Sequence, residues 1–397
     1  MSAESRTLAP RTLPYGRQCL DAEDRQAVLD VLSGDWLTQG PMVERFEGAL
    51  SEALGSTHAV ACSNGTAALH LAALALGWTP GDVVLVPAIT FLASANCCAY
   101  VGAEPYFVDV DDRTITIDPN DTEARIKQLR AAGRRVRGVV AVDMGGHPAD
   151  WVALRELADR YDLHLVDDAC HALGATYAGG DRIGSGKHAD VTLLSFHPVK
   201  HITTGEGGAV LANDGRVAER ARLLRSHGMV RGPEDVPNWE GPWHSDMVEL
   251  GFNYRLTDMQ CALGLSQLRK LPAFVERRRS IAARYTQKFA GTAVRTPEEQ
   301  DGARHAYHLY LARTSFDRVS RREFFERCRD RGILLQVHYR PVPLNSFYRK
   351  AAWNADIDRR IPVSLRYYDE TFSLPMFPSL EDAEVDRVVE TVLECLA

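Results

Sequence analysis

The sequence predicts an α/β fold with a mostly parallel central sheet, helices on both of its faces and a smaller C-terminal α+β domain. Short runs of β-branched and other apolar residues alternate with longer segments of helical periodicity as far as residue 268. These runs are nearly continuous in apolar residues. Such strands, separated by helices, are typical of a parallel sheet that is covered on both sides.

The expected strands follow one another along the first part of the chain. They span residues 83–86, 105–108, 136–142, 164–166 and 191–196. Amphipathic spacing predicts helices between them over residues 122–132 and 151–161. Open α/β sheets bind ligands in the crevice beyond the carboxyl ends of their strands. The residues that follow each strand are therefore the first candidates for a functional site.

The pattern changes after residue 268. We expect a long charged helix over 269–289, a strand at 308–314, a helix over 321–331 and an extended run at 333–339. A chain of 397 residues exceeds the usual size of one domain. We divide it into an N-terminal segment (1–35), a large domain (36–268) and a small C-terminal domain (269–397).

A long loop is expected over residues 231–249, which contain three prolines, Trp239 and Trp243. Loops of this length are usually functional or mobile, although the tryptophans would equally suit packing. The sequence does not decide between these two interpretations.

Composition excludes several classes of protein. The net charge of −7 argues against a nucleic-acid surface, which needs a basic face. No stretch is long and apolar enough to span a membrane, and residues 1–13 lack the apolar core of a secretory signal. The eight cysteines form no C-x-x-C pair, which indicates reduced thiols in a cytoplasmic protein.

An anion site is expected where a helix begins at Asn64, Gly65 and Thr66. Asn64 is a suitable N-cap, and the Ala and Leu residues that follow favour helix. A Gly-Thr turn at a helix N-terminus offers backbone N–H groups and a hydroxyl to an anion. The alternative is an ordinary capped helix of the core.

Asp168 and Lys200 follow two successive strands of the expected sheet. An aspartate in the crevice can pair with a ring nitrogen and keep it protonated, or it can simply cap the next turn. A lysine in such a crevice can have a lowered pKa and react as a neutral amine, although most lysines are solvated surface charges. Because both lie at strand ends, we expect them to face one cofactor.

Two other motifs are rejected. Residues 183–188 look similar to a phosphate-binding P-loop, but Asp181 stands where the first glycine is required and His188 where Ser or Thr is required. The histidines at 171, 188, 197 and 201 lack the spacing and the accompanying ligands of a zinc site. We therefore expect no bound metal.

At these residues the chain resembles the DegT–StrS nucleotide-sugar aminotransferases, which have the aspartate aminotransferase fold, type I. The resemblance runs from Tyr15 to the C-terminus. Its markers are residues 37–41, 64–66, 90–91, Asp168 with His171, 195–208 and 251–255. Residues 15–19, 225–229 and 331–339 are similar to the subgroup that aminates C4 of a UDP-linked 4-keto-6-deoxy-N-acetyl sugar for pseudaminic acid biosynthesis. His201 and the length of the loop at 231–249 depart from that subgroup.

The resemblance implies a role for each matched residue. Lys200 carries pyridoxal 5′-phosphate (PLP), and Asp168 pairs with its pyridine nitrogen. Phe91 stacks on the ring, and His171 lies near its hydroxyl group. The phosphate is held by Gly65, Thr66 and Ser195, with Asn253 reaching the phosphate of the other subunit of a homodimer. Weaker candidates for the sugar or its approach are Thr38, Glu206, His338 and Tyr339.

The implied reaction is a transamination in two halves. L-Glutamate leaves its amino group on the cofactor as pyridoxamine 5′-phosphate (PMP), and the keto sugar then receives it, with Lys200 moving the proton. Three alternatives stay open: another dTDP- or GDP-linked keto sugar aminated at C3 or C4, a PLP- or PMP-dependent sugar dehydratase, and a non-catalytic sensor. Related dehydratases carry histidine in place of the lysine, so Lys200 argues against the second.

Overall fold

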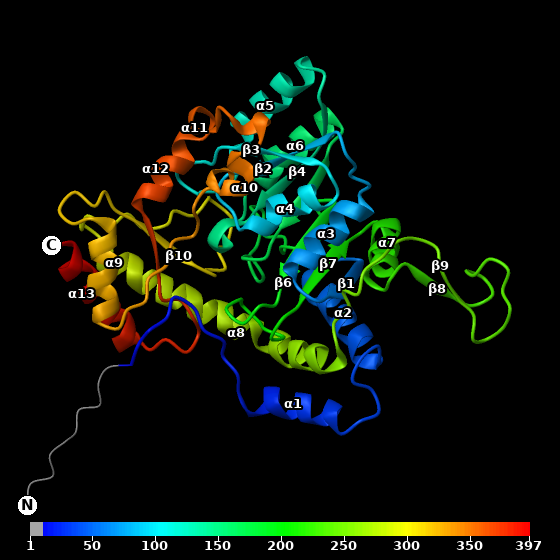
Figure 1. Cartoon of the computed structure of the whole chain (residues 1–397). Coiled ribbons are helices and arrows are strands. Elements are labelled where there is room, and N and C mark those ends of the chain that lie inside the picture. Colours follow the sequence, from blue (N-terminus) through cyan, green and yellow to red (C-terminus); the bar gives the residue numbers. More distant parts are fainter. Residues whose placement is uncertain (1–10) are drawn as a thin grey trace, which may run out of the picture.

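The computed structural model describes residues 11–397, and its centre is a seven-stranded sheet with the order β1-β7-β6-β5-β4-β2-β3 (Figure 1). The strands are β1 (His58–Cys62), β2 (Asp82–Pro87), β3 (Glu104–Val108), β4 (Arg135–Val142), β5 (His164–Asp168), β6 (Val191–Ser195) and β7 (Gly208–Ala212). Strand β7 runs antiparallel to β1 and β6. The pairs from β6 through β5, β4 and β2 to β3 are parallel. The prediction of a mostly parallel sheet is confirmed.

All five predicted strands are present, with ends that agree within two residues. Strands β1 and β7 are additional. Their sequences, His-Ala-Val-Ala-Cys and Gly-Ala-Val-Leu-Ala, are rich in alanine, which is depleted in strands. Burial in the sheet rather than local preference makes these two segments extended.

Helices cover both faces of the sheet, as expected. They are α1 (Ala22–Leu32), α2 (Pro41–Leu54), α3 (Gly65–Ala75), α4 (Leu92–Tyr100), α5 (Pro119–Ala131), α6 (Trp151–Tyr161) and α7 (Gly215–Arg225), with a short 3₁₀ turn η1 (Met144–Gly146). One core cluster joins α2, α5 and α6 to one face. A second cluster joins α3, α4 and α7 to the other. The predicted helix at 151–161 is α6, and the one at 122–132 is α5, which begins three residues earlier behind the N-cap Asp118.

The long charged helix ends where the sequence predicts but begins eleven residues earlier, as α8 (Asp258–Phe289). Its first turn is closed by a capping box between Thr257 and Gln260, and Pro272 lies inside the helix. The residues before 269 are more apolar because they pack on the large sheet. Leu271 and Val275 belong to the same core cluster, so contact with the large domain continues past the change of composition, and the domain junction expected at 268/269 lies inside α8.

The C-terminal part contains a small sheet of β10 (Tyr310–Arg313) and β11 (Thr371–Leu374), flanked by α9 (Arg321–Asp330) and α13 (Asp382–Leu396). The predicted strand and helix correspond to β10 and α9. The extended run expected at 333–339 is not a strand. Ile333 bridges to Leu13 and Gln336 to Ser373, so the segment pairs with two different neighbours at single positions.

Residues 342–370 form short helical elements that lead back toward the large sheet (Figure 1). They are η2 (Val342–Leu344), α10 (Ser346–Arg349), η3 (Ala352–Asn354), α11 (Ile357–Arg360) and α12 (Pro362–Glu370). Tyr348 and Ile357 belong to the same core cluster as Phe107 of β3. Part of the segment expected in the small domain therefore packs on the large sheet.

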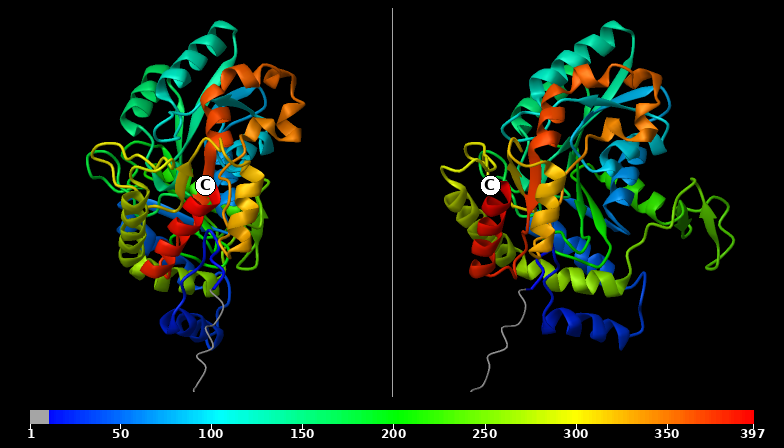
Figure 2. Two further views of the ribbon diagram at one scale, coloured as in Figure 1. Left: turned by 90° about the vertical axis from the view of Figure 1, so that its left-hand side faces the viewer. Right: turned by 60° about the vertical axis from the view of Figure 1, so that its left-hand side comes forward.

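Most of the segment predicted as a long loop (231–249) lies within a β-hairpin. Strands β8 (Met229–Arg231) and β9 (Ser245–Met247) pair antiparallel, and the hairpin projects away from the body of the molecule (Figure 2). Trp243 is 78% exposed and Leu250, just past β9, is 77% exposed. Val236 is buried and Trp239 stacks on His244, whereas the side chains of Trp243 and Leu250 face solvent. Among the described residues, no helix combines the length and the apolarity needed to cross a bilayer.

Candidate active site

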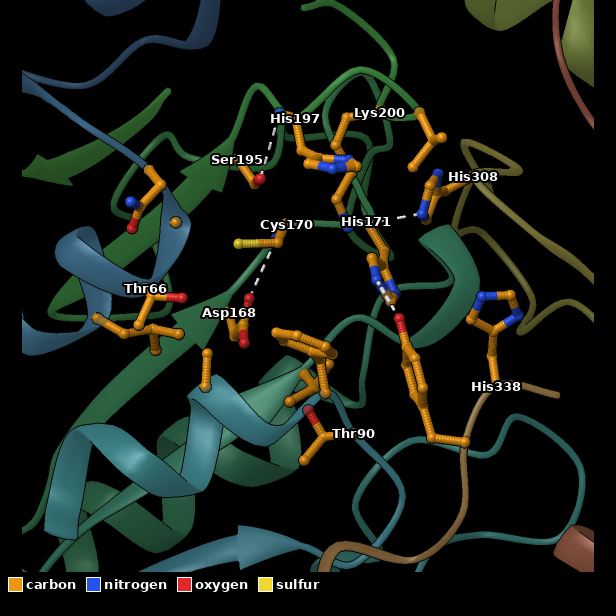
Figure 3. Close-up of a pocket in the computed structure, with 18 of the residues that line it drawn as sticks. Thr66, Thr90, Asp168, Cys170, His171, Ser195, His197, Lys200, His308 and His338 are labelled. Atoms are coloured by element: carbon orange, nitrogen blue, oxygen red, sulfur yellow. Dashed lines mark hydrogen bonds between the residues drawn. The ribbon is translucent and has the colours of Figure 1, made fainter. Parts of the chain in front are cut away.

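A cavity of about 580 Å³ lies beyond the carboxyl ends of the central strands, where the sequence predicts the site (Figure 3). Asp168 ends β5, Lys200 lies in the loop after the adjacent strand β6, and Gly65 and Thr66 begin α3. All four residues line the cavity, together with Ser195. The expectation that Asp168 and Lys200 face one space therefore agrees with the geometry.

Lys200 presents its amine to the cavity from a loop that is tied down at both ends. Its backbone N–H donates to the carbonyl of His197, and Thr204 N–H donates to the carbonyl of Phe196. Burial lowers the pKa of Lys200; Arg278 acts in the same direction, whereas Cys170 and Asp168 oppose it. A lysine with a lowered pKa is more often a neutral amine, which is the nucleophilic and basic form.

Asp168 is held by two hydrogen bonds. Ser94 Oγ lies 2.5 Å from Asp168 Oδ2, and Thr90 Oγ1 lies 2.7 Å from Ser94 Oγ. The backbone N–H of Cys170 donates to Asp168 Oδ1 at 3.2 Å. The carboxyl group of Asp168 is buried, and these donors fix its orientation. Hydrogen bonds to a charged acceptor partly compensate the loss of water around it.

The start of α3 forms the other end of the cavity. Asn64 is the N-cap, as predicted, and its side chain accepts from Ala67 N–H at 2.8 Å. The amides of Gly65 and Thr66 come before the first N–H that can bond within the helix. A Cβ atom on Gly65 would lie 3.0 Å from Ser195 Cβ and 3.2 Å from Cys170 Sγ. Glycine therefore lets the helix N-terminus approach the cavity wall closely, which suits an anion.

Aromatic side chains and histidines form the remaining wall. His171 Nε2 lies 3.2 Å from Tyr339 Oη, and Gly145 N–H donates to His171 Nδ1 at 3.4 Å. Since Nδ1 is an acceptor, the proton of neutral His171 lies on Nε2. Burial lowers the pKa of His171 well below its usual value and that of His338 to about 3. Both rings are therefore neutral at physiological pH.

Comparison with known proteins decides the family. Residues 18–393 match the DegT/DnrJ/EryC1/StrS aminotransferase family. The chain belongs to this family. It is 35% identical over 388 residues to the UDP-4-amino-4,6-dideoxy-N-acetyl-beta-L-altrosamine transaminase of Campylobacter jejuni, with 97% of each protein covered.

Two solved structures of similar proteins agree with this assignment. The aminotransferase PseC of Helicobacter pylori, involved in the biosynthesis of pseudoaminic acid, has a TM-score of 0.87 at 30% identity, with 97% of this chain and 99% of PseC covered. A Streptococcus pneumoniae protein described as a sugar aminotransferase, in its PLP form, has a TM-score of 0.87 at 28% identity, with 97% and 98% covered. The chain is a PLP-dependent sugar aminotransferase with the fold of these enzymes.

The residues of this aminotransferase fit PLP. The cofactor carries a phosphate, a ring nitrogen and an aldehyde, and the cavity offers a helix N-terminus, a buried carboxylate and an amine. Phe91, which is 52% exposed, lines the same space. Among the described residues no group of His, Cys, Asp or Glu is arranged to hold a metal ion.

Ten of the twelve residues singled out from the sequence line this cavity, and two do not. Thr38 and Asn253 are exposed and lie outside it. Thr38 bridges to Thr257, and Asn253 bridges to Ser226 at the base of the β8–β9 hairpin. The remaining ten are Gly65, Thr66, Phe91, Asp168, His171, Ser195, Lys200, Glu206, His338 and Tyr339.

Several residues of the site were not identified from the sequence. Ser94 contacts Asp168 from inside α4, and His308 reaches Lys200 from the segment between α8 and β10. Tyr15 lines the cavity from the N-terminal segment, with its ring 5.0 Å from that of His338. Ser94 lies four residues after Thr90, which precedes the N-cap of α4, and this short spacing between two hydroxyl residues is the signal that could have indicated it.

Proposed function

We propose that Lys200 carries PLP and that this enzyme transfers an amino group from L-glutamate to C4 of a UDP-linked 4-keto-6-deoxy-N-acetylhexosamine, in a cytoplasmic pathway of the pseudaminic acid type. The observation that carries the proposal is the placement of Lys200, Asp168 and the N-terminus of α3 around one cavity. The named activity of the Campylobacter jejuni relative supports the choice of sugar.

The roles of the chain's own residues follow from their contacts. Bound PLP withdraws electrons from the carbon that bears the amino group, and a protonated ring nitrogen strengthens this effect. Asp168, oriented by Ser94, keeps that nitrogen protonated. The Lys200 amine, once displaced, removes the proton from the donor's α-carbon and returns it to the cofactor. The amides of Gly65 and Thr66 and the hydroxyls of Thr66 and Ser195 hold the phosphate.

The lining of the cavity is suitable for a sugar. Glu206, Gln336, His338 and Tyr339 offer hydrogen-bonding groups to the cavity. Lys200 is the one lysine, and no arginine lines the cavity among the described residues, so a nucleotide diphosphate needs cations from elsewhere. In a homodimer the second subunit would supply these cations. The exposed Asn253 would then contact the cofactor phosphate in the partner's site. Thr38 stays a weaker candidate for the sugar or its approach.

The alternatives differ in the substrate or in the reaction. Another keto sugar, such as a dTDP- or GDP-linked one aminated at C3 or C4, would use the same Lys200 and Asp168. A sugar dehydratase on this fold would need histidine at position 200. Since lysine stands there, we favour amino transfer.

Replacement of the lysine tests the assignment of Lys200. Lys200→Ala should remove the absorbance of lysine-bound PLP and lower turnover by about 10³-fold or more, because both attachment and proton transfer depend on the amine. Lys187→Ala is the control, since Lys187 is exposed, pairs with Asp181 and lies outside the cavity. Retention of the absorbance in Lys200→Ala would contradict the proposal.

A panel of nucleotide sugars tests the substrate. UDP-, dTDP- and GDP-linked amino sugars should each be added to the PLP-loaded enzyme while the lysine-bound absorbance is followed. The UDP-linked 4-amino-4,6-dideoxy-N-acetyl sugar should discharge it at the lowest concentration. A dTDP- or GDP-linked sugar acting at lower concentration would instead identify that class as the substrate.

A further inference from the structure

The side chain of His308 lies within hydrogen-bonding reach of the Lys200 amine. Its Nε2 lies 3.5 Å from Lys200 Nζ, and its ring centroid lies 4.5 Å from that of His171 (Figure 3). The residue is 3% exposed and lines the cavity. It comes from the segment that follows α8, so it approaches Lys200 from the C-terminal part of the chain.

The backbone around His308 is held from two sides. Arg278 on α8 is fully buried, and its Nη1 donates to the carbonyls of Tyr307 at 3.2 Å, His308 at 3.3 Å and Met376 at 2.9 Å. On the other side, Leu309 N–H donates to the carbonyl of Gly145 at 3.1 Å. These hydrogen bonds fix the position of the His308 backbone, and therefore the point from which its imidazole projects. A side chain that only fills space would not need its backbone held in this way.

The surroundings of His308 keep it neutral. Burial lowers its pKa well below the usual value, and Lys200, His171, His201 and Arg278 act in the same direction. Its Nδ1 is buried and has no hydrogen-bond partner among the described residues. A neutral imidazole has one N–H and one acceptor nitrogen. When Lys200 is an ammonium ion it can only donate, so the acceptor must be Nε2 and the proton lies on Nδ1.

We propose that His308 is a positioning residue for Lys200, whose amine donates to His308 Nε2 whenever the lysine is detached from the cofactor. The proposal rests on the proposed role of Lys200. The lysine must leave the cofactor and return to it in each half of the reaction, and a four-carbon side chain has many conformations available. The hydrogen bond selects one of them. With one N–H directed at His308, the lone pair of the neutral amine stays free for the cavity.

Two variants at position 308 separate this role from a structural one. His308→Phe keeps a ring against His171 and removes both nitrogens, whereas His308→Gln offers an amide oxygen as an acceptor. In cofactor-free protein mixed with PLP, the rate at which the lysine-bound absorbance appears should fall about tenfold in His308→Phe, because orientation of the amine is lost. His308→Gln should stay within about threefold of the wild type.

A second measurement uses the loaded enzyme. Discharge of the absorbance by L-glutamate in a single turnover should slow in His308→Phe, while the glutamate concentration that gives half the maximal rate stays unchanged. Melting temperatures of both variants report any general loss of structure, and His308→Leu replaces the phenylalanine variant if that one does not fold.

The outcomes distinguish this inference from the proposed function. Attachment and discharge at wild-type rates in His308→Phe would overturn the role of His308, as would a glutamine variant as slow as the phenylalanine variant at equal stability. Failure of the wild-type protein to attach PLP at Lys200 would instead contradict the proposed function.

Discussion

At the scale of single residues, the site depends on side chains that orient the reactive ones. No arginine or lysine within residues 11–397 bonds to Asp168, and its carboxyl group is oriented by the Ser94 hydroxyl and the Cys170 amide. Thr90 in turn contacts Ser94. All of these groups are buried except Cys170, which is half-buried, so no water competes for the hydroxyls of Thr90 and Ser94. The direction in which Asp168 points is therefore determined by the Ser94 hydroxyl and the Cys170 amide, with Thr90 in contact with the hydroxyl of Ser94.

Removal of the Ser94 hydroxyl should disturb this orientation. A hydrogen bond to a charged group contributes about 1.5–3 kcal/mol, so Ser94→Ala should lower turnover roughly ten- to a hundredfold. It should also lower the pH at which the ring nitrogen of bound PLP loses its proton, which nitrogen-15 NMR of labelled cofactor measures. Ser94→Thr keeps the hydroxyl and is the control. Unchanged turnover and ring protonation in Ser94→Ala would contradict this role.

At the scale of elements, the β8–β9 hairpin is the feature that packs least on its own chain. Met247 is 59% exposed and Leu250 is 77% exposed. Asn253, for which the resemblance implies a role in the partner's site, lies at the base of this hairpin. The hairpin is thus continuous with the interface that we propose between two copies of the chain.

Charges on the hairpin should weaken self-association. Met247→Glu and Leu250→Glu would place carboxylates in an apolar contact, which costs free energy unless they are paired. Sedimentation of the double variant should show a monomer at concentrations where the wild type is a dimer. Val152→Glu, at a half-exposed position on α6, should leave the dimer intact. A wild-type monomer, or an unchanged dimer in the double variant, would contradict the proposed interface.

At the scale of the whole molecule, a pair of buried acids next to Asp168 links stability to pH. Burial raises the pKa of Asp143 to about 7, and burial together with the charge of Asp143 raises the pKa of the neighbouring Asp167. Each has one oxygen with partners: Trp151 Nε1 donates to Asp143 Oδ1 at 2.8 Å, and Tyr177 Oη donates to Asp167 Oδ2 at 2.9 Å. Their other oxygens have no partner in the part of the chain that the structure describes, so a proton shared between them would satisfy both.

The raised pKa predicts the direction of the pH dependence. The folded chain holds this proton more tightly than the unfolded chain does. Binding of this proton therefore stabilises the fold fully below the pKa that Asp has in the unfolded chain. The stabilisation is lost as pH rises through about 7. In Asp143→Asn an amide takes the place of the proton. Relative to the wild type, this variant should gain stability between pH 4 and pH 8, by a few kcal/mol at most.

Urea unfolding at several pH values measures this difference. Asp301→Asn, at an exposed turn position, is the control and should keep the wild-type slope. A constant difference between wild type and Asp143→Asn across this pH range would show that the pair does not hold a proton.

The sequence was sufficient to predict those residues of the site whose positions follow from the local sequence and from the order of the strands. Lys200 and Asp168 follow successive strands, and Gly65 with Thr66 begins a capped helix, so each could be placed from its own neighbourhood. His308 and Tyr15 could not, because the segments that bear them lie far from Lys200 and His338 in the chain. Strands β1 and β7 escaped prediction for a related reason, since burial overrides the low strand preference of alanine.

The sequence by itself determined the class of fold, the carboxyl-end location of the site and the lysine and aspartate at its centre. These depend on periodicity and on residue types at strand ends, which are local properties. The tertiary structure alone decided which side chains orient them: Ser94 for Asp168, and the Arg278-held His308 for Lys200. Such contacts arise from packing between segments that are distant in the sequence, and no periodic pattern of residues indicates a hydrogen bond between them.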